Sequence, residues 1–176
     1  MNAAFLDRLR GSIRDVPDFP KPGILFKDIT PVLGDAALLG DIIEEFAVAS
    51  RSLGVHKVVG VESRGFIFGT PLALALQVGF VPVRKKGKLP WTCEAVSYAL
   101  EYGEATVEIH KDAILPGEKV VVIDDLLATG GTAAAAVELV QRLGGEVVEA
   151  QFLIELGFLD GRKRLPGIPV RSLLSF

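Results

Sequence analysis

Cysteine is almost absent from the 176 residues, because Cys93 is the only one. An intramolecular disulfide and a zinc site built from cysteines are therefore excluded, and a reducing compartment fits the chain best. Long apolar runs are also lacking. The longest, residues 65–80, is broken by glycine, proline and glutamine and falls short of the roughly 18 residues that span a bilayer. We expect a buried helix there and no membrane association.

Blocks of like charge are missing as well. The formal net charge is −3 and 23% of the residues are charged, which is ordinary for a folded protein and indicates no nucleic-acid partner. Residues 1–13, MNAAFLDRLRGSI, mix charged and apolar residues and lack the continuous apolar core of a signal peptide. We therefore expect a cytoplasmic protein.

The apolar residues that are present make up 49% of the chain, enough for one sizeable core, and the length is usual for one domain. We treat residues 1–176 as a single domain. Short apolar segments read KVVGV, GFVPV, KVVVI and EVVEAQFLI, and helical patterns lie between them. Strands that alternate with helices in this way indicate an α/β fold, with a parallel core sheet flanked by helices on both faces.

Two segments depart from this alternation. The proline-rich segment DVPDFPKPG lies between a short helix in the first dozen residues and a second helix at residues 35–53, and it predicts an ordered extended loop. The basic loop RKKGKLP precedes SYALEY and ATVEIH, which alternate as paired antiparallel strands do. This insertion is suited to form a small antiparallel flap over an active site.

The strongest chemical signal is the segment KVVVIDDLLATGGTAAAAVELVQRL. A predicted strand leads into Asp124 and Asp125, and a loop of residues 128–132 precedes an alanine-rich helix. Glycines allow a tight turn that points backbone amides inward, threonines add hydroxyl donors, and the helix start contributes a positive dipole end. We predict a phosphate cradle here. Because ligands of open parallel sheets bind beyond the carboxyl ends of the strands, further site residues should follow KVVGV and GFVPV.

Other interpretations of this loop are weaker. It lacks the Gly-Lys-Ser/Thr ending of a nucleotide triphosphate P-loop and the three-glycine spacing of a dinucleotide fingerprint. The plainer alternative is a glycine turn in which Asp125 or Thr132 serves only as a helix cap. Two adjacent carboxylates followed by Thr-Gly-Gly-Thr exceed what a cap requires, so we favour the phosphate site.

The strand-Asp-Asp-x-x-x-Thr-Gly-Gly-Thr pattern resembles the signature of the type I phosphoribosyltransferases. Five further segments, in matching order, are similar to adenine phosphoribosyltransferases: DFPKPGILFKDITPVL, GVESRGFIFGTPLALAL, VPVRKKGKLP, YALEYG and LIELGFLDGRKRL. The similarity covers nearly the whole chain. It implies the type I phosphoribosyltransferase fold, with residues 1–34 as a base-binding hood segment and residues 85–110 as a flexible loop and flap.

The resemblance also implies the contacts to the sugar phosphate. Asp124 and Asp125 would hold the ribose hydroxyls, which suits carboxylates because they accept hydrogen bonds and would repel a phosphate. The loop residues expected to grip the 5′-phosphate are Ala128, Thr129, Gly130, Gly131 and Thr132.

The cations of the site are expected to bind pyrophosphate. In the family the loop GVESRGF binds this leaving group, so Arg64 would neutralise it, with assistance from Arg84, Lys85 and Lys88 of the basic loop. The plain alternative for each is a solvated surface charge. Without the resemblance, we would interpret the lysine-rich loop as a solvated, exposed loop.

The remaining expected roles concern the base. The resemblance assigns Glu101 to proton handling at the purine ring and Tyr102 to closing the flap, whereas the plain alternative for Glu101 is an exposed carboxylate. The residues that match positions around adenine in the family are Leu25, Phe26, Lys27 and Leu156. The family usually has arginine where Lys27 stands, and Phe26 is equally suited to a core position.

The implied activity is that of a pentosyltransferase of purine salvage, in which adenine and phosphoribosyl pyrophosphate give AMP and pyrophosphate. Magnesium is the expected cofactor, held mainly by substrate and water because the sequence has no dedicated carboxylate cage. A homodimer is expected from the resemblance. The alternatives are transfer to hypoxanthine, guanine or xanthine, and a non-catalytic regulator that senses phosphoribosyl pyrophosphate.

Overall fold

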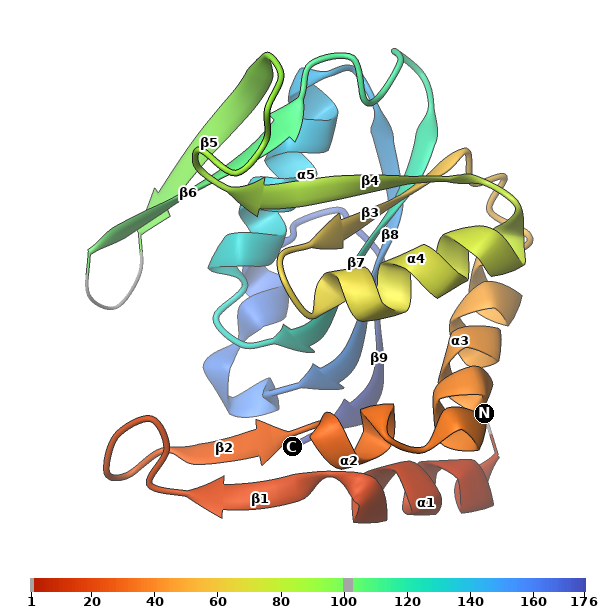
Figure 1. Ribbon diagram of the computed structural model, residues 1–176, viewed down its shortest axis with the longest axis vertical. Helices are drawn as coiled ribbons and strands as arrows, with labels where there is room; N and C mark the ends of the chain where they lie inside the picture. Colours follow the sequence, from red (N-terminus) through yellow and green to blue (C-terminus); the bar gives the residue numbers. More distant parts are fainter. Residues whose placement is uncertain (1, 100–102) are drawn as a thin grey trace. The chain divides into compact units, whose positions relative to one another are not determined.

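The valine- and isoleucine-rich segments of the sequence form the strands of one mixed sheet (Figure 1). The structure is a computed structural model that describes residues 2–99 and 103–176. These residues form two compact units, one up to Glu45 and one from Phe46 onward. The sheet lies in the second unit, and its seven strands within the described residues follow the order β5-β6-β4-β3-β7-β8-β9.

The core of this sheet is parallel, as predicted. Its strands are β3 (Lys57–Val61), β4 (Gly79–Lys85), β7 (Lys119–Leu127), β8 (Glu146–Glu155) and β9 (Val170–Ser175). Residues on both faces of β3 and β7 are buried, which explains why these strands read as continuous apolar runs instead of alternating ones. The last strand, β9, is one that the sequence analysis did not foresee.

Helices cover both faces of the sheet. Helix α4 (Gly65–Leu76) connects β3 to β4, and helix α5 (Gly131–Arg142) connects β7 to β8. Since β4 and β8 lie on opposite sides of the β3–β7 pair, right-handed crossovers place the two helices on opposite faces. The expected buried helix is therefore confirmed in α4, although it buries one side only and leaves Leu74 75% exposed.

The predicted antiparallel insertion is present. Strands β5 (Cys93–Ala99) and β6 (Glu104–His110) pair antiparallel, and β6 continues the sheet by pairing antiparallel with β4. Residues 100–102, which include Glu101 and Tyr102, lie outside the described part of the chain.

The first unit contains the proline-rich segment. Helix α1 (Ala3–Ser12) precedes strands β1 (Arg14–Pro17) and β2 (Leu25–Asp28), which pair antiparallel, and α2 (Thr30–Leu33) precedes α3 (Ala36–Ser50). The extended conformation was predicted for this segment, but its pairing with β2 was not. The connection is shaped by Asp18, whose side chain accepts a 2.8 Å hydrogen bond from the backbone N–H of Gly23.

After β8 the chain forms two short 3-10 helices, η1 (Gly157–Leu159) and η2 (Gly161–Arg164), before it enters β9. Within residues 2–99 and 103–176, no helix is both long enough and apolar enough to cross a bilayer.

The packing of β8 in the second unit predicts a large effect of truncating Phe152, which is fully buried in the main apolar cluster. Replacing Phe152 by alanine should lower the free energy of unfolding by about 3–5 kcal/mol, because it leaves a cavity that the core does not refill. Urea denaturation measures the change. Phe158 is 75% exposed, so Phe158→Ala is the control and should change stability by less than about 0.5 kcal/mol. Equal losses in the two variants would contradict this packing.

Candidate active site

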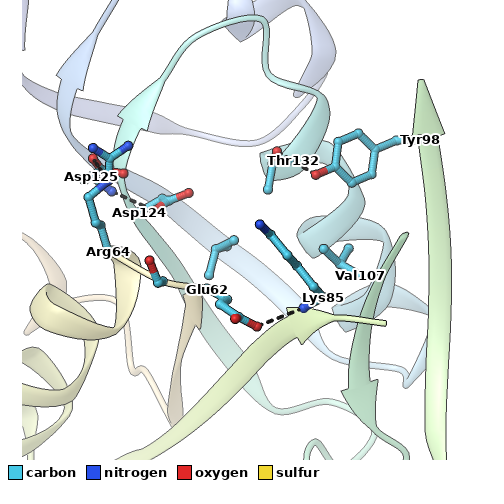
Figure 2. A pocket seen from close by; sticks show the side chains of 10 residues that line it. Glu62, Arg64, Lys85, Tyr98, Val107, Asp124, Asp125 and Thr132 are labelled. Carbon is cyan, nitrogen blue, oxygen red and sulfur yellow. Dashed lines mark hydrogen bonds and ion pairs between the residues drawn. The ribbon is translucent and has the colours of Figure 1, made fainter. Parts of the chain in front are cut away.

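A cavity of about 390 Å³ opens at the carboxyl ends of β3 and β7 (Figure 2). This is the edge at which an open parallel sheet presents its ligand site. The residues that line the cavity are Val61, Glu62, Ser63, Arg64, Lys85, Tyr98, Val107, Asp124, Asp125 and Thr132. The structure therefore brings together Arg64, Lys85 and the aspartate pair, which the sequence analysis had placed in one site.

A smaller cavity of about 80 Å³ lies beside the first and shares Asp124 and Thr132 with it. Its wall is the loop that connects β7 to α5, and it includes all five residues of the predicted phosphate cradle, 128–132. The sugar-phosphate residues singled out in the sequence thus form one continuous surface from the aspartates to the loop.

Gly130 sets the conformation of this loop. Its φ angle is +81°, a region that residues with side chains rarely adopt, and it is the residue before the first turn of α5. The N-cap residue of α5 is Gly130, so neither Asp125 nor Thr132 occupies the cap position. The first amides of an α-helix lack intrahelical acceptors and carry the positive dipole end, which suits this loop to an anion.

The two aspartates sit at the edge of the larger cavity. A 2.9 Å hydrogen bond joins the backbone N–H of Asp125 to Oδ1 of Asp124. Removal from bulk water, and then the neighbouring charge of Asp125, raise the pKa of Asp124 well above its usual value of 3.8. Burial also raises the pKa of Asp125, although the guanidinium of Arg64 opposes that shift.

Close packing of α4 against this strand end explains the glycine after Arg64. A Cβ atom on Gly65 would lie 2.7 Å from the carbonyl oxygen of Ile123 and 3.0 Å from Oδ1 of Asp124. Only glycine lets the start of α4 come this near. Arg64 is thereby held beside the aspartates, and its Nε lies 2.8 Å from Oδ2 of Asp125.

Glu62 organises the basic end of β4. Its Oε2 lies 3.1 Å from Nε of Arg84 and accepts a 3.0 Å hydrogen bond from the backbone N–H of Lys85. Burial opposes ionisation of Glu62, but these hydrogen bonds and the nearby positive charges outweigh it and lower the pKa of the carboxyl group. With the backbone so held, the Lys85 side chain extends into the cavity (Figure 2).

The other two basic residues are placed differently. Arg84 pairs with Glu62 and donates a 3.1 Å hydrogen bond to the carbonyl oxygen of Lys88. Neither Arg84 nor Lys88 is among the residues that line the two cavities. The Lys88 side chain is exposed. In this structure Arg84 thus shapes the loop, and Lys85 is the basic-loop residue at the cavity.

Tyr98 is a cavity residue that the sequence analysis missed. Its hydroxyl lies 2.9 Å from the hydroxyl of Thr132, so it connects β5 to the start of α5 (Figure 2). The signal was the alternation of β5, in which Tyr98 lies two residues beyond the buried Val96 and therefore shares its face. Glu62 and Ser63 belong to the loop GVESRGF, which the resemblance assigned to pyrophosphate, but neither was given a role of its own.

The predicted base-binding residues lie in different elements. Leu25, Phe26 and Lys27 are on β2, where Leu25 is 51% exposed. The ring of Phe26 packs edge-on against that of Phe19, with the ring centroids 5.1 Å apart. Nζ of Lys27 lies 2.6 Å from Oδ1 of Asp15 on β1. Leu156 follows β8, and its backbone N–H donates a 2.9 Å hydrogen bond to the carbonyl oxygen of Leu127.

The carboxylate oxygens that line the cavity belong to Glu62, Asp124 and Asp125. Among the described residues, no group of three or more histidine, cysteine, aspartate or glutamate side chains is arranged to hold a metal ion. Carboxylate oxygens are hard ligands that suit Mg²⁺, an ion that commonly keeps water and substrate oxygens in its coordination shell. The donor set therefore fits a magnesium ion bound largely through a ligand.

Comparison with known proteins agrees with this geometry. Residues 36–165 match the family model described as a phosphoribosyl transferase domain. The chain is 58% identical to the adenine phosphoribosyltransferase of Myxococcus xanthus over 168 residues, which cover 96% of this chain and 91% of that protein. It is also 57% identical over 167 residues to the adenine phosphoribosyltransferase of Nocardioides sp., with coverage of 93% and 90%.

Solved structures give the same result. The adenine phosphoribosyltransferase of Rhodothermus marinus superimposes with a TM-score of 0.94 at 57% identity, over 99% of this chain and all of that one. The enzyme of Saccharomyces cerevisiae, solved with adenine and an imino-altritol bisphosphate, gives a TM-score of 0.93 at 44% identity, over 98% of this chain and 99% of that one.

The raised pKa of Asp124 predicts a pH-dependent stability change. Between pH 3.8 and its raised pKa, the folded chain retains a proton that the unfolded chain has lost, so this residue makes the protein less stable as pH rises. Asp124→Asn removes that cost. The variant should melt at a higher temperature than the wild type at neutral pH, and the difference should shrink as the pH falls toward 3.8.

Thermal denaturation across this pH range measures the effect. Asp112 is exposed, so Asp112→Asn serves as the control and should show no comparable gain at neutral pH. A lower melting temperature for Asp124→Asn at every pH would mean that the ionised carboxylate stabilises the fold.

Proposed function

The chain belongs to the adenine phosphoribosyltransferases of the phosphoribosyl transferase domain family, and on that premise we propose how its residues perform the family reaction. Adenine and phosphoribosyl pyrophosphate give AMP and pyrophosphate. The observation that carries the proposal is the continuity of two cavities, one with an anion-binding loop and one with both carboxylates and cations, joined at Asp124 and Thr132.

The 5′-phosphate of the substrate occupies the loop of residues 128–132. Support comes from the left-handed Gly130 and from the exposed amide end of α5. The ribose then lies over Asp124 and Asp125, whose oxygens accept hydrogen bonds from its two hydroxyls. Holding the sugar at both ends fixes the anomeric carbon in the larger cavity, which supplies the positioning part of catalysis.

The pyrophosphate group faces Arg64 and Lys85. Purine N9 attacks the anomeric carbon as the bond to pyrophosphate breaks, so positive charge gathers on the ribose ring and negative charge on the leaving group. Preorganised cations that face this charge lower the barrier. Nε of Arg64 lies 2.8 Å from Oδ2 of Asp125, so the pair holds the guanidinium at the edge of the cavity. Arg84 and Lys88 contribute by shaping the loop that carries Lys85 and by adding positive charge around it.

Magnesium would be held here mainly by substrate oxygens and water, beside the carboxylates of Asp124 and Asp125. When bound, the ion supplies stabilisation of the negative charge on pyrophosphate. Arg64 and Lys85 stabilise the same charge from the protein side, while the aspartates orient the ribose.

The base is read by backbone groups of Leu25 and Lys27, and Phe26 and Leu156 belong to the same set of matched family positions. Support comes from their match to the family positions and from the exposure of Leu25. The Lys27 side chain pairs with Asp15 and thus braces β2, so its backbone carries the recognition. Glu101 exchanges the proton of the purine ring, and Tyr102 closes the flap.

The protein acts as a cytoplasmic homodimer in which the neighbouring subunit contributes part of the charge around pyrophosphate. The family resemblance supports the dimer, and the single cysteine suits a reducing compartment.

Substrate choice tests the proposal directly. Adenine, hypoxanthine, guanine and orotate are offered separately with phosphoribosyl pyrophosphate and magnesium, and consumption of each base is followed by its absorbance. Adenine alone should be consumed. Consumption of hypoxanthine or guanine at a comparable rate would assign the site to another purine, and consumption of none would favour a sensor of phosphoribosyl pyrophosphate.

Glu101→Gln should lower kcat by roughly 100-fold, because general acid–base catalysis by one group is typically worth that much or more. The KM for phosphoribosyl pyrophosphate should stay near the wild-type value, since the residue acts on the base. Steady-state kinetics measure both constants. Glu104 lies three residues further along the chain and is exposed at the start of β6, so Glu104→Gln is the matched control and should keep wild-type turnover. Unchanged turnover in Glu101→Gln would remove this residue from the mechanism.

A further inference from the structure

The segment of residues 156–164, LGFLDGRKR, packs directly against the phosphate loop of residues 128–132. A Cβ atom on Gly130 would collide with the carbonyl oxygen of Gly161, and a Cβ atom on Gly161 would collide with the carbonyl oxygen of Ala128. The two backbones thus touch with no side chain between them. The position of Gly161 therefore limits how far Ala128 and Gly130 can move in that direction.

Gly161 is held by its neighbour, Arg162. The guanidinium of Arg162 makes a two-pronged contact with Glu155 at the end of β8, with Nε–Oε1 and Nη2–Oε2 distances of 2.7 and 2.6 Å. It also donates a 2.8 Å hydrogen bond to the carbonyl oxygen of Val170 on β9. One side chain thereby ties the short helix η2 to two strands of the sheet.

Glu155 is suited to anchor this contact. The carboxyl group is almost fully buried and accepts a further 2.8 Å hydrogen bond from the hydroxyl of Ser172. The hydrogen bonds from Arg162 are the largest influence on Glu155, and they lower its pKa despite its burial. Both partners are therefore charged at neutral pH, and paired charge-assisted hydrogen bonds fix the orientation of a guanidinium more firmly than a single bond does.

We propose that Arg162 is a positioning residue for the substrate's 5′-phosphate. It acts through the backbone of Gly161, which contacts Ala128 and Gly130 and keeps the backbone amides of the loop in the geometry that binds the phosphate. The inference rests on the proposed function, because it takes the loop of residues 128–132 as the 5′-phosphate site. In the segment LIELGFLDGRKRL, which resembles the family, the sequence analysis gave a role to Leu156 alone. The proposal adds a role for Arg162.

The variant that tests this role is Arg162→Gln. It keeps a polar side chain but removes the positive charge and the two-pronged contact with Glu155. Titration calorimetry compares the binding of ribose 5-phosphate, which needs the phosphate loop, with that of pyrophosphate and magnesium, which needs Arg64 and Lys85. Ribose 5-phosphate should bind about tenfold or more weakly, since displacement of a positioning element by about an ångström is costly. Pyrophosphate should bind as in the wild type.

Kinetics should show the same division. In Arg162→Gln the KM for phosphoribosyl pyrophosphate should rise by roughly tenfold or more, while the KM for adenine changes little. Arg162→Lys keeps the charge without the two-pronged contact, so it should fall between the wild type and Arg162→Gln. It also serves as the measurable variant if Arg162→Gln does not fold. Gly161→Ala, which pushes on Ala128 without breaking the ion pair, should give the same selective loss.

The chain offers a matched control on the same two strands. Arg171 pairs with the buried Glu149 at 3.1 Å, and Glu149 lies six residues before Glu155 on β8, roughly 20 Å away along an extended strand. Arg171→Gln thus breaks an equivalent pair far from the phosphate loop. It should leave the affinity for ribose 5-phosphate unchanged even where it lowers the melting temperature.

Two results would overturn the proposal. One is equal weakening of ribose 5-phosphate and pyrophosphate binding in Arg162→Gln and Arg162→Lys, and the other is the same loss in Arg171→Gln. Either would mean that the pair only stabilises the fold. A wild-type protein that binds ribose 5-phosphate but transfers no adenine would contradict the proposed function while leaving this test intact.

Discussion

Parallel pairing of β7 with β3 brings two polar strand ends to one edge of the sheet, and the site depends on that register. Val58 pairs with Val121 and Gly60 with Ile123, so Arg64, which follows β3, and Asp125, near the carboxyl end of β7, lie side by side. A slip of one residue would turn the apolar side chains of β7 to the opposite face. The register is therefore protected by the core itself, to which β3 contributes Val59 and Val61 and β7 contributes Val120 and Val122.

Charge balance at this edge is the second constraint. Two adjacent carboxylates and the start of α5 lie where water is partly excluded, and removal from water raises the pKa of Asp124 and Asp125. Arg64 offsets part of this cost, as Arg84 does for Glu62. Each cation thus holds a carboxylate, and Arg64 does so in the wall of the larger cavity. The arrangement lets the protein keep carboxylates and cations together at one cavity.

Much of this arrangement could be predicted from local patterns. The parallel core strands, the helix that begins at Gly65 and the loop of residues 128–132 all followed from hydrophobic runs and glycine placement. Strand β9 was missed because VRSLLS has neither the long apolar run of a central strand nor clear alternation. The β1–β2 pairing was missed because prolines dominate its local signal. Tyr98, Glu62 and Arg162 were missed because their roles arise from partners 34, 22 and 7 residues away along the chain.

The sequence alone determined the class of fold and the family resemblance, and it predicted a phosphate loop at residues 128–132. Each depends on short-range patterns, such as side-chain periodicity, glycine placement and a helix start. Only the tertiary structure decided which cation reaches the cavity. Arg84 and Lys85 are neighbours in a basic run, yet Arg84 pairs with Glu62 and Lys85 lines the cavity. Such choices depend on strand register and burial, which set the distance between charges that lie far apart in the chain.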